Sequence, residues 1–292
     1  MLMVSLELKG CGGLSEASLN CPLLTSLDAS FCSQLTDDCL SATTRACPLI
    51  ESLILMSCPS IGLDGLCSLQ WLPNLALLDL SYTFLVNLQP VFDSCSQLKV
   101  LKLQACKFLT DSSLEPLYKG GALPALQELD LSYGTLCQKA IEELLSCCTH
   151  LTRVSLNGCV NMHDLNWGYS RGNFPELPGE VDVACLNLCW LNLSHCSSLE
   201  VLKLECPRLT NLFLQDYLRL AQHSLDFLTC HGEELSRPLV LFRTIYAVSW
   251  QVLTYKLEFA LKGCQIIGVL EVLSRLVVGL PWFKVRSIAL CL

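Results

Sequence analysis

The sequence predicts an α/β fold: a leucine-rich-repeat solenoid with a parallel sheet on its concave side and helices on its convex side. Apolar residue pairs, separated by one residue, recur about every 25 residues over much of the chain. A cysteine follows most of these pairs at one fixed spacing, and short helical patterns lie between the pairs. No single turn of this length can bury its own leucines, so neighbouring turns must stack to do so.

The apolar pairs mark the expected strands, because alternate residues of a strand point to the same face. Successive pairs are 21, 26, 25, 23, 28, 25 and 37 residues apart. All but the last step are typical of leucine-rich repeats, whose turns have about 20–29 residues. The pairs are Leu6/Leu8, Leu27/Ala29, Leu53/Leu55, Leu78/Leu80, Leu101/Leu103, Leu129/Leu131, Val154/Leu156 and Leu191/Leu193.

A cysteine stands five residues after the first member of six of the eight pairs. This position follows the strand, where the chain turns inward, so we expect the side chain to point into the solenoid and pack there as a small hydrophobic group. Stacked turns place these cysteines in a row, which supplies no tetrahedral set of metal ligands. The eight residues at this position are Cys11, Cys32, Cys58, Thr83, Cys106, Gly134, Cys159 and Cys196.

Short helices are predicted between the strands. Residues 36–38 and 110–111 contain the Thr and Asp that favour a helix N-terminus, and apolar residues at helical spacing follow both. A third helical pattern runs over residues 138–145. Pairs such as Cys47-Pro48 precede the next strand, where a proline ends the helix and starts an extended segment.

The pattern changes at two places. Gly, Pro and polar residues over 165–180 predict an inserted loop. The apolar pairs then recur every 10 or 11 residues, which leaves no room for helices and predicts nearly all-β turns after about residue 180, with a strand on each side of the coil. The array is therefore expected over residues 1–216, and residues 217–292 form a non-repeat tail, either a cap or an aberrant C-terminus.

Composition excludes several classes of function. The net charge of −8 argues against a nucleic-acid partner, because phosphate binding needs clustered Lys and Arg. No apolar stretch is long enough for a membrane helix. The 20 cysteines, without a signal peptide pattern, indicate reduced thiols in a cytoplasmic or nuclear protein. No phosphate loop, HExxH or G-x-S-x-G motif is present, so neither an enzyme nor a cofactor is expected.

The outward-facing strand residues form the expected protein-binding face. The residue between the members of each pair points to the concave surface, and four of these residues are acidic. They predict an acidic track for a basic segment or helix of a protein partner, with Ile54 and Met56 as apolar anchors. The alternative is a solvated strand face without a partner. The candidate residues are Glu7, Asp28, Ile54, Met56, Asp79, Lys102, Asp130, Arg153, Ser155 and Asn192.

Residues 47–53 with Cys58, and residues 101–103 with Cys106 and 109–111, resemble the cysteine-containing leucine-rich repeats of F-box proteins. Residues 180–215 are most similar to the large plant F-box/leucine-rich-repeat proteins. The resemblance covers about 215 of 292 residues. It implies the substrate-recognition module of an SCF-type (cullin) E3 ubiquitin ligase, acting in ubiquitin-dependent protein degradation.

The F-box, which in that family binds the ligase adaptor, is not found, because the chain begins inside a repeat at Leu6/Leu8. Adaptor binding is therefore expected only of a longer form that carries an F-box. The alternative function is a stand-alone protein–protein interaction scaffold or decoy, which binds the same target without delivering it to a ligase.

Overall fold

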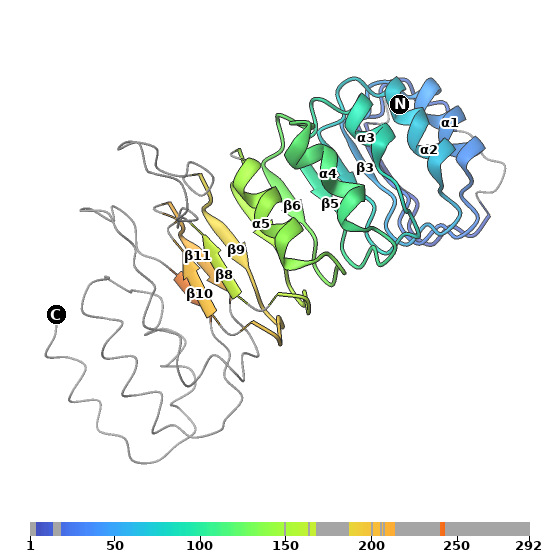
Figure 1. Cartoon of the computed structure of the whole chain (residues 1–292). Helices are drawn as coiled ribbons and strands as arrows, with labels where there is room; N and C mark the ends of the chain where they lie inside the picture. Colours follow the sequence, from blue (N-terminus) through green and yellow to red (C-terminus); the bar gives the residue numbers. More distant parts are fainter. Residues whose placement is uncertain are drawn as a thin grey trace, which may run out of the picture.

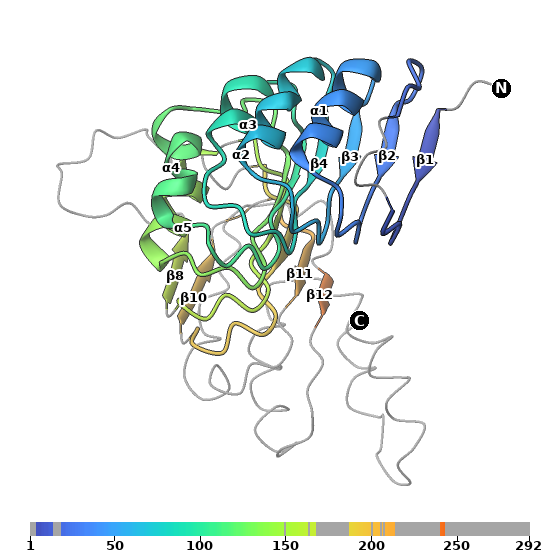
Figure 2. The same ribbon diagram turned by 90° about the vertical axis from the view of Figure 1, so that its right-hand side faces the viewer.

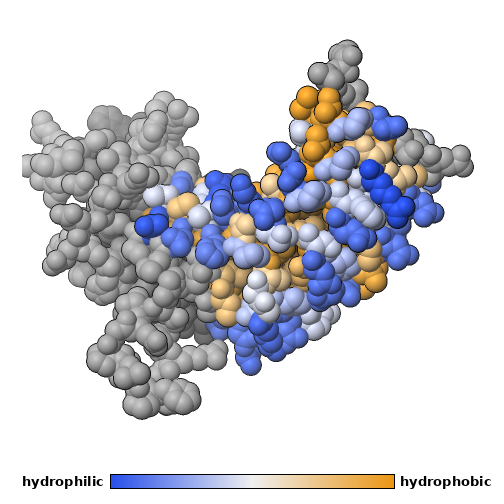
Figure 3. Space-filling model, turned by 90° about the horizontal axis from the view of Figure 1, so that it is seen from above, coloured by the Kyte–Doolittle hydropathy of each residue, from blue (hydrophilic) through white to orange (hydrophobic). Residues whose placement is uncertain are grey.

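The computed structural model describes residues 4–13, 19–148, 150–162, 164–167, 187–199, 201–204, 206, 208–213 and 240–242. In this part of the chain, helices lie on one side of a long parallel sheet (Figures 1 and 2). Seen along the strands, the described surface is hollowed on the side that carries the sheet (Figure 3). The predicted architecture, a leucine-rich-repeat solenoid with a concave sheet and convex helices, is confirmed.

Ten described strands form the main sheet, and neighbouring strands are parallel and in register. The first member of every predicted apolar pair is the central residue of its strand, so all eight pairs are confirmed. The strands are β1 (Ser5–Glu7), β2 (Ser26–Asp28), β3 (Ser52–Ile54), β4 (Leu77–Asp79), β5 (Val100–Lys102), β6 (Glu128–Asp130), β7 (Arg153–Ser155), β9 (Trp190–Asn192), β11 (Asn211–Phe213) and β12 (Val240–Phe242).

The helices lie between successive strands and are short, as predicted. Their buried residues, such as Leu40, Leu114 and Ile141, pack on the row of strand leucines in one hydrophobic core. The helical segments are α1 (Asp37–Ala46), α2 (Leu63–Cys67), the 3-10 turn η1 (Ser68–Trp71), α3 (Gln89–Ser94), α4 (Asp111–Lys119) and α5 (Gln138–Cys147).

The last part of the array differs in two details from the expectation. Strands β8 (Asp164–Trp167) and β10 (Val201–Leu204) form a separate parallel pair, so residues 165–167 belong to a strand and their assignment to the inserted loop is wrong. Residues 165–167 form a strand by pairing with β10, which lies far along the chain. Local composition does not encode so distant a partner. Residues 168–180 lie outside the described residues, and so do Val181 and Val183, the first of the apolar pairs that recur every 10 or 11 residues.

The predicted strand on each side of the coil is confirmed, because β9 and β11 join the main sheet while β10, between them, joins β8. The main sheet also continues past residue 216, where the array was expected to end. Leu241 of β12 is in register with Leu212 of β11. The connection between these two strands lacks the cysteine spacing, so the sequence pattern did not reveal β12. The rest of residues 217–292 lies outside the described residues.

The cysteines that follow the strands form a ladder through the core. Each thiol donates to a backbone carbonyl of the preceding turn: Cys58 Sγ lies 3.1 Å from Ala29 O, and Cys196 Sγ lies 3.0 Å from Leu156 O. Cys32, Cys106 and Cys159 make the same contact with Leu8, Leu80 and Leu131. A thiol suits this position because it packs as an apolar group while satisfying a second lone pair of the carbonyl.

Cys11 departs from the prediction, because it is exposed. It follows β1, the first strand of the sheet, so no preceding turn in the described residues covers it. At the two non-cysteine positions the contacts are different. Thr83 Oγ1 donates to Leu80 O of its own turn at 2.6 Å. A Cβ on Gly134 would lie only 2.8 Å from Leu131 O, so a glycine is required there.

The predicted N-terminal caps are confirmed at two helices. Thr36 Oγ1 accepts from the backbone N–H of Cys39 at 3.4 Å, and the N–H of Thr110 donates to Ser113 Oγ at 3.1 Å. The first acidic residue of each helix reaches the next turn: Asp37 Oδ1 accepts from the N–H of Gly62 at 2.7 Å, and Asp111 Oδ1 from that of Cys137 at 2.9 Å. These side chains stabilise helix starts that otherwise leave backbone donors unpaired.

Replacing Thr36 with Ala is expected to lower the free energy of unfolding by about 1 kcal/mol, because the cap of α1 loses its acceptor. Thr36→Ser keeps the hydroxyl and should recover most of this loss. Urea unfolding, followed by far-ultraviolet circular dichroism, measures both changes. Equal stability of the Ala and Ser variants would contradict a role for the hydroxyl.

Candidate protein-binding face

Two rows of side chains face outward from the concave sheet, on either side of the buried central residues. The register places Leu77, Val100, Glu128, Arg153 and Trp190 in the row at which the strands begin. The second row, at which the strands end, holds Glu7, Asp28, Ile54, Asp79, Lys102, Asp130, Ser155, Asn192 and Phe213. The strands thus bring eight of the ten candidate residues into one row, with Arg153 in the other row and Met56 two residues after Ile54.

Three aspartates of the second row accept hydrogen bonds from the backbone of their own turns. Oδ1 of Asp28, Asp79 and Asp130 accepts from the backbone N–H of the serine two residues later, at 3.0, 2.9 and 2.9 Å. Asn192 makes the same bond to Ser194 at 3.0 Å. Asp28 and Asp79 are also buried. Their carboxylates therefore stabilise the bend after the strand, a role that the acidic-track hypothesis did not include.

The carboxylate of Asp28 makes a further contact beyond the hydrogen bond to its own turn. Its other oxygen, Oδ2, lies 3.1 Å from Lys9 Nζ. Burial alone would raise the pKa of Asp28, but hydrogen bonds from Ser30 and the contact with Lys9 outweigh it, and the pKa is lowered. Asp28 is therefore charged at neutral pH and already paired within the protein.

A half-buried apolar patch lies over the middle of the concave face, formed by Ile54, Met56, Leu77 and Val100 of the β3, β4 and β5 turns. The sequence predicted Ile54 and Met56 but missed Leu77 and Val100. The missed signal is the residue before each apolar pair, which is Ser in the first three strands and apolar in β4 and β5. Such a patch is a natural anchor for apolar side chains of a partner.

A second cluster, which we call the arginine–aromatic ladder, extends from Arg153 across β6, β7, β9 and β11. Its Nε lies 3.1 Å from Glu128 Oε2, and its guanidinium carbon lies 4.9 Å from the ring centroid of Trp190. The rings of Trp190 and Phe213 are 5.0 Å apart. The sequence predicted Arg153 as a site residue but missed Phe213. Beyond the 37-residue step, the sequence pattern does not determine which strands join the concave sheet. The ladder provides flat, partly polar surface of the kind that is enriched at protein interfaces.

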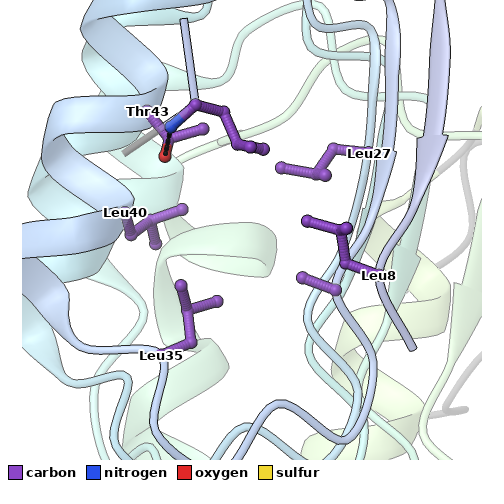
Figure 4. Close-up of a pocket in the computed structure, with 7 residues that line it drawn as sticks. Leu8, Leu27, Leu35, Leu40 and Thr43 are labelled. Carbon is purple, nitrogen blue, oxygen red and sulfur yellow. Dashed lines mark hydrogen bonds between the residues drawn. The ribbon is translucent and has the colours of Figure 1, made fainter. Parts of the chain in front are cut away.

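A small cavity lies in the apolar interior of the first turns. Its volume is about 10 Å³, and it is lined by Leu8, Leu27, Leu35, Leu40 and Thr43 among others (Figure 4). It is too small for a ligand larger than water. Within the described residues, no group of three or more His, Cys, Asp or Glu could hold a metal ion.

The Cys196 thiol is buried and donates to Leu156 O, whereas His195 is half-buried on the bend, with a φ of 57°. Among the described helices, none has the length and hydrophobicity that a membrane span requires.

Comparison with known proteins places the fold in a family. Residues 63–225 match the family described as "FBD-associated F-box protein At5g56370, LRR repeats". F-box/LRR-repeat protein 4 of Bos taurus is 26% identical over 190 residues, which cover 64% of this chain and 30% of the cattle protein. The chain thus spans under a third of that relative.

Solved structures that resemble the chain include an internalin and a leucine-rich-repeat domain. An internalin of Listeria monocytogenes has 15% identity and a TM-score of 0.38, over 73% of this chain and 75% of its own. The leucine-rich-repeat domain of APL1B has 18% identity and a TM-score of 0.39, over 60% of this chain and 50% of its own. Because the family match spans more than half of the sequence, this chain belongs to the leucine-rich repeats of the FBD-associated F-box protein family.

Proposed function

We propose that the chain is the substrate-recognition module of an SCF-type (cullin) E3 ubiquitin ligase and acts in ubiquitin-dependent protein degradation. The observation that carries the proposal is an apolar patch on the concave sheet of a chain that belongs to an F-box protein family. The module binds the substrate, and other subunits perform the transfer of ubiquitin.

The concave face has the two components that a protein interface requires. The apolar patch of Ile54, Met56, Leu77 and Val100 provides an anchor region that excludes water when covered. Lys102 and the Arg153–Glu128 pair flank it with polar groups that orient a partner. Since strands fix the spacing of these side chains, binding requires little reorganisation, which favours affinity.

A second candidate is the stand-alone scaffold or decoy. It is favoured by one observation: each of the helices α1 to α5 lies between two strands of the repeat array. The described residues therefore contain no separate helical unit that could bind a ligase adaptor.

Affinity capture of the tagged chain from cell extract, with mass spectrometry of the bound proteins, separates these functions. Capture of a target together with cullin and its adaptor supports the ligase module. Capture of a target without them supports the scaffold or decoy. Recovery of cullin and adaptor without any further protein would contradict a substrate-binding role for the face.

The double variant Ile54→Ala/Leu77→Ala is expected to weaken capture of the target by roughly 10- to 100-fold, because two central anchors are truncated. The matched control is Leu49→Ala/Leu63→Ala, which removes two exposed leucines outside the strands, with exposed fractions of 41% and 48%. Binding of the recovered target to each purified variant is measured by calorimetry. Equal affinity of both double variants would rule out the apolar patch as the anchor.

A further inference from the structure

A second row of core residues crosses the turns where the chain approaches each strand. Its members stand six residues before the strand centres, which are in register, so they occupy equivalent places in successive turns. In the turns of β2 to β7, two cysteines are adjacent only at the beginning of this turn-start row, because leucines separate the others. The row consists of Cys21, Cys47, Leu72, Cys95, Leu123 and Cys148.

The thiol of Cys47 lies directly against the backbone of Cys21. The N–H of Cys21 donates to Cys47 Sγ at 3.3 Å, and nearby the N–H of Leu19 donates to Thr43 Oγ1 at 3.4 Å. Equivalent atoms of neighbouring strands are about 4.8 Å apart, and disulfides span Cα separations of about 4.4–6.8 Å. The two cysteines therefore have a backbone separation that a disulfide can bridge.

The two thiols differ in their access to solvent. Cys21 is half-buried, whereas Cys47 is fully buried. Burial raises the pKa of the Cys47 thiol, although the hydrogen bond from the Cys21 N–H acts in the opposite direction, so this thiol stays protonated at neutral pH. A dissolved oxidant can therefore reach Cys21, but it does not react directly with Cys47.

Cys47 is also held less firmly than the thiols of the cysteine ladder. Its Sγ lies 3.6 Å from Leu19 O, whereas Cys32 and Cys58 each donate to a carbonyl of the preceding turn at 3.1 Å. A hydrogen bond this long costs little to break. The Cys47 side chain can therefore turn toward Cys21 without the loss that a ladder thiol would incur.

We propose that Cys21 and Cys47 form a reversible disulfide when the chain meets a peroxide, and that this bond fastens the first turn of the array to α1. The Cys21 sulfur attacks one peroxide oxygen, the O–O bond breaks, and a sulfenic acid and one water form. The Cys47 sulfur then attacks the sulfenic sulfur, the S–O bond breaks, and the S–S bond forms with release of a second water. The thiol protons leave in the two waters, so one peroxide is reduced as two thiols are oxidised.

The bond acts at the end of the array that has the fewest neighbours among the described strands. There β1 pairs only with β2, and Leu6 and Leu8 are only partly buried. Cys47 is the C-cap residue of α1, so the disulfide joins the segment between β1 and β2 to the first helix. A cross-link of this kind opposes local opening of the end turn. The inference does not depend on the proposed ligase function.

The test uses the full, reduced chain, which is treated with hydrogen peroxide, blocked with N-ethylmaleimide and digested without reductant. Cleavage after Lys and Arg and before Asp places Cys21 in peptide 10–27, Cys32 in peptide 28–36 and Cys47 in peptide 46–63. We expect mass spectrometry to find peptide 10–27 joined to peptide 46–63. A link of peptide 10–27 to peptide 28–36 instead, or overoxidation of Cys21 without any link, would overturn the proposal.

The variant Cys21→Ser should abolish this link. The matched control is Cys11→Ser, which removes an exposed thiol from the same peptide and should leave the link intact. A link that persists in Cys21→Ser would assign it to Cys11 and contradict the proposal. So would a disulfide between two copies of the chain, which appears as a dimer on a non-reducing gel.

Oxidation should raise the melting temperature of the chain by about 3–6 °C, and a phosphine reductant should reverse the rise. Cys11→Ser should show the same rise, and Cys21→Ser should not. A linked chain with an unchanged or lower melting temperature would show that the bond does not fasten the first turn. None of these measurements needs a partner protein, so failure of this proposal and failure of the concave face are distinguishable.

Discussion

Replacing Leu101 with Ala is expected to lower the free energy of unfolding by about 3–4 kcal/mol. Leu101 is fully buried at the centre of β5, in register with Leu78 and Leu129 of the neighbouring strands. Truncation removes its apolar contacts and leaves a cavity between turns that the strand spacing prevents from closing. Among single substitutions this is one of the most damaging that the array offers.

Urea unfolding of the two proteins at neutral pH, with reducing agent, measures the loss. The control is Lys102→Ala, which changes the next residue of the same strand but points to the concave surface and should alter stability by no more than about 0.5 kcal/mol. A small loss at Leu101, equal to that at Lys102, would mean that the turns are not packed as the structure describes. Because each turn contacts mainly its neighbours, the backbone amides of the β4 and β6 turns should be the first to lose protection against hydrogen exchange.

Alkaline pH is expected to destabilise the chain through its buried thiols. Burial raises the pKa of Cys95 to about 12, from an ordinary value of 9.0. Burial also raises the pKa of Cys159 to about 12, and the neighbouring Cys196 adds to the effect. The folded state therefore holds these protons more tightly than the unfolded state.

The sign of the effect follows from this difference. Below pH 9 the thiols are protonated in both states, and stability is unaffected. Between pH 9 and 12 the unfolded chain ionises while the folded chain does not, so the free energy of unfolding falls by about 1.4 kcal/mol per pH unit for each thiol. At pH 10 the two thiols together cost about 3 kcal/mol relative to pH 8.

Urea unfolding at pH 8 and pH 10, in the presence of reducing agent, tests this dependence. Between pH 8 and pH 10, the free energy of unfolding of the Cys95→Ala variant should fall by about 1.4 kcal/mol less than that of the unsubstituted chain. This holds whatever the stability of the variant at pH 8. Leu49→Ala, at an exposed position without an ionisable group, should leave the loss unchanged. If Cys95→Ala retains the full pH dependence, the thiol does not hold its proton in the folded state.

The aspartates show where a surface hypothesis based on sequence needed correction. Reversal of charge at Asp28, Asp79 and Asp130 is not a clean test of an acidic binding track. Because each carboxylate accepts a backbone N–H of its own bend, the substitution would also destabilise the turns. Variants of the apolar patch are the cleaner test, since Ile54 and Leu77 make no such bonds.

The sequence by itself determined the repeat: the strand centres, the cysteine ladder and the caps at Thr36 and Thr110. These features are local, because the alternation of a strand and the residue types of a helix start are set within a few residues. It also determined the outward row of the concave face, since strand geometry fixes which side chains leave the core.

Only the tertiary structure decided which outward groups remain available. Whether a carboxylate faces solvent or accepts from its own turn depends on the bend after the strand, as at Asp79. The contacts of Arg153 with Trp190 and of Phe84 with Phe108 join residues that are distant in the chain, as does the pairing of β8 with β10. A repeat pattern specifies the face on which a side chain lies, but the distances between turns are set by their packing.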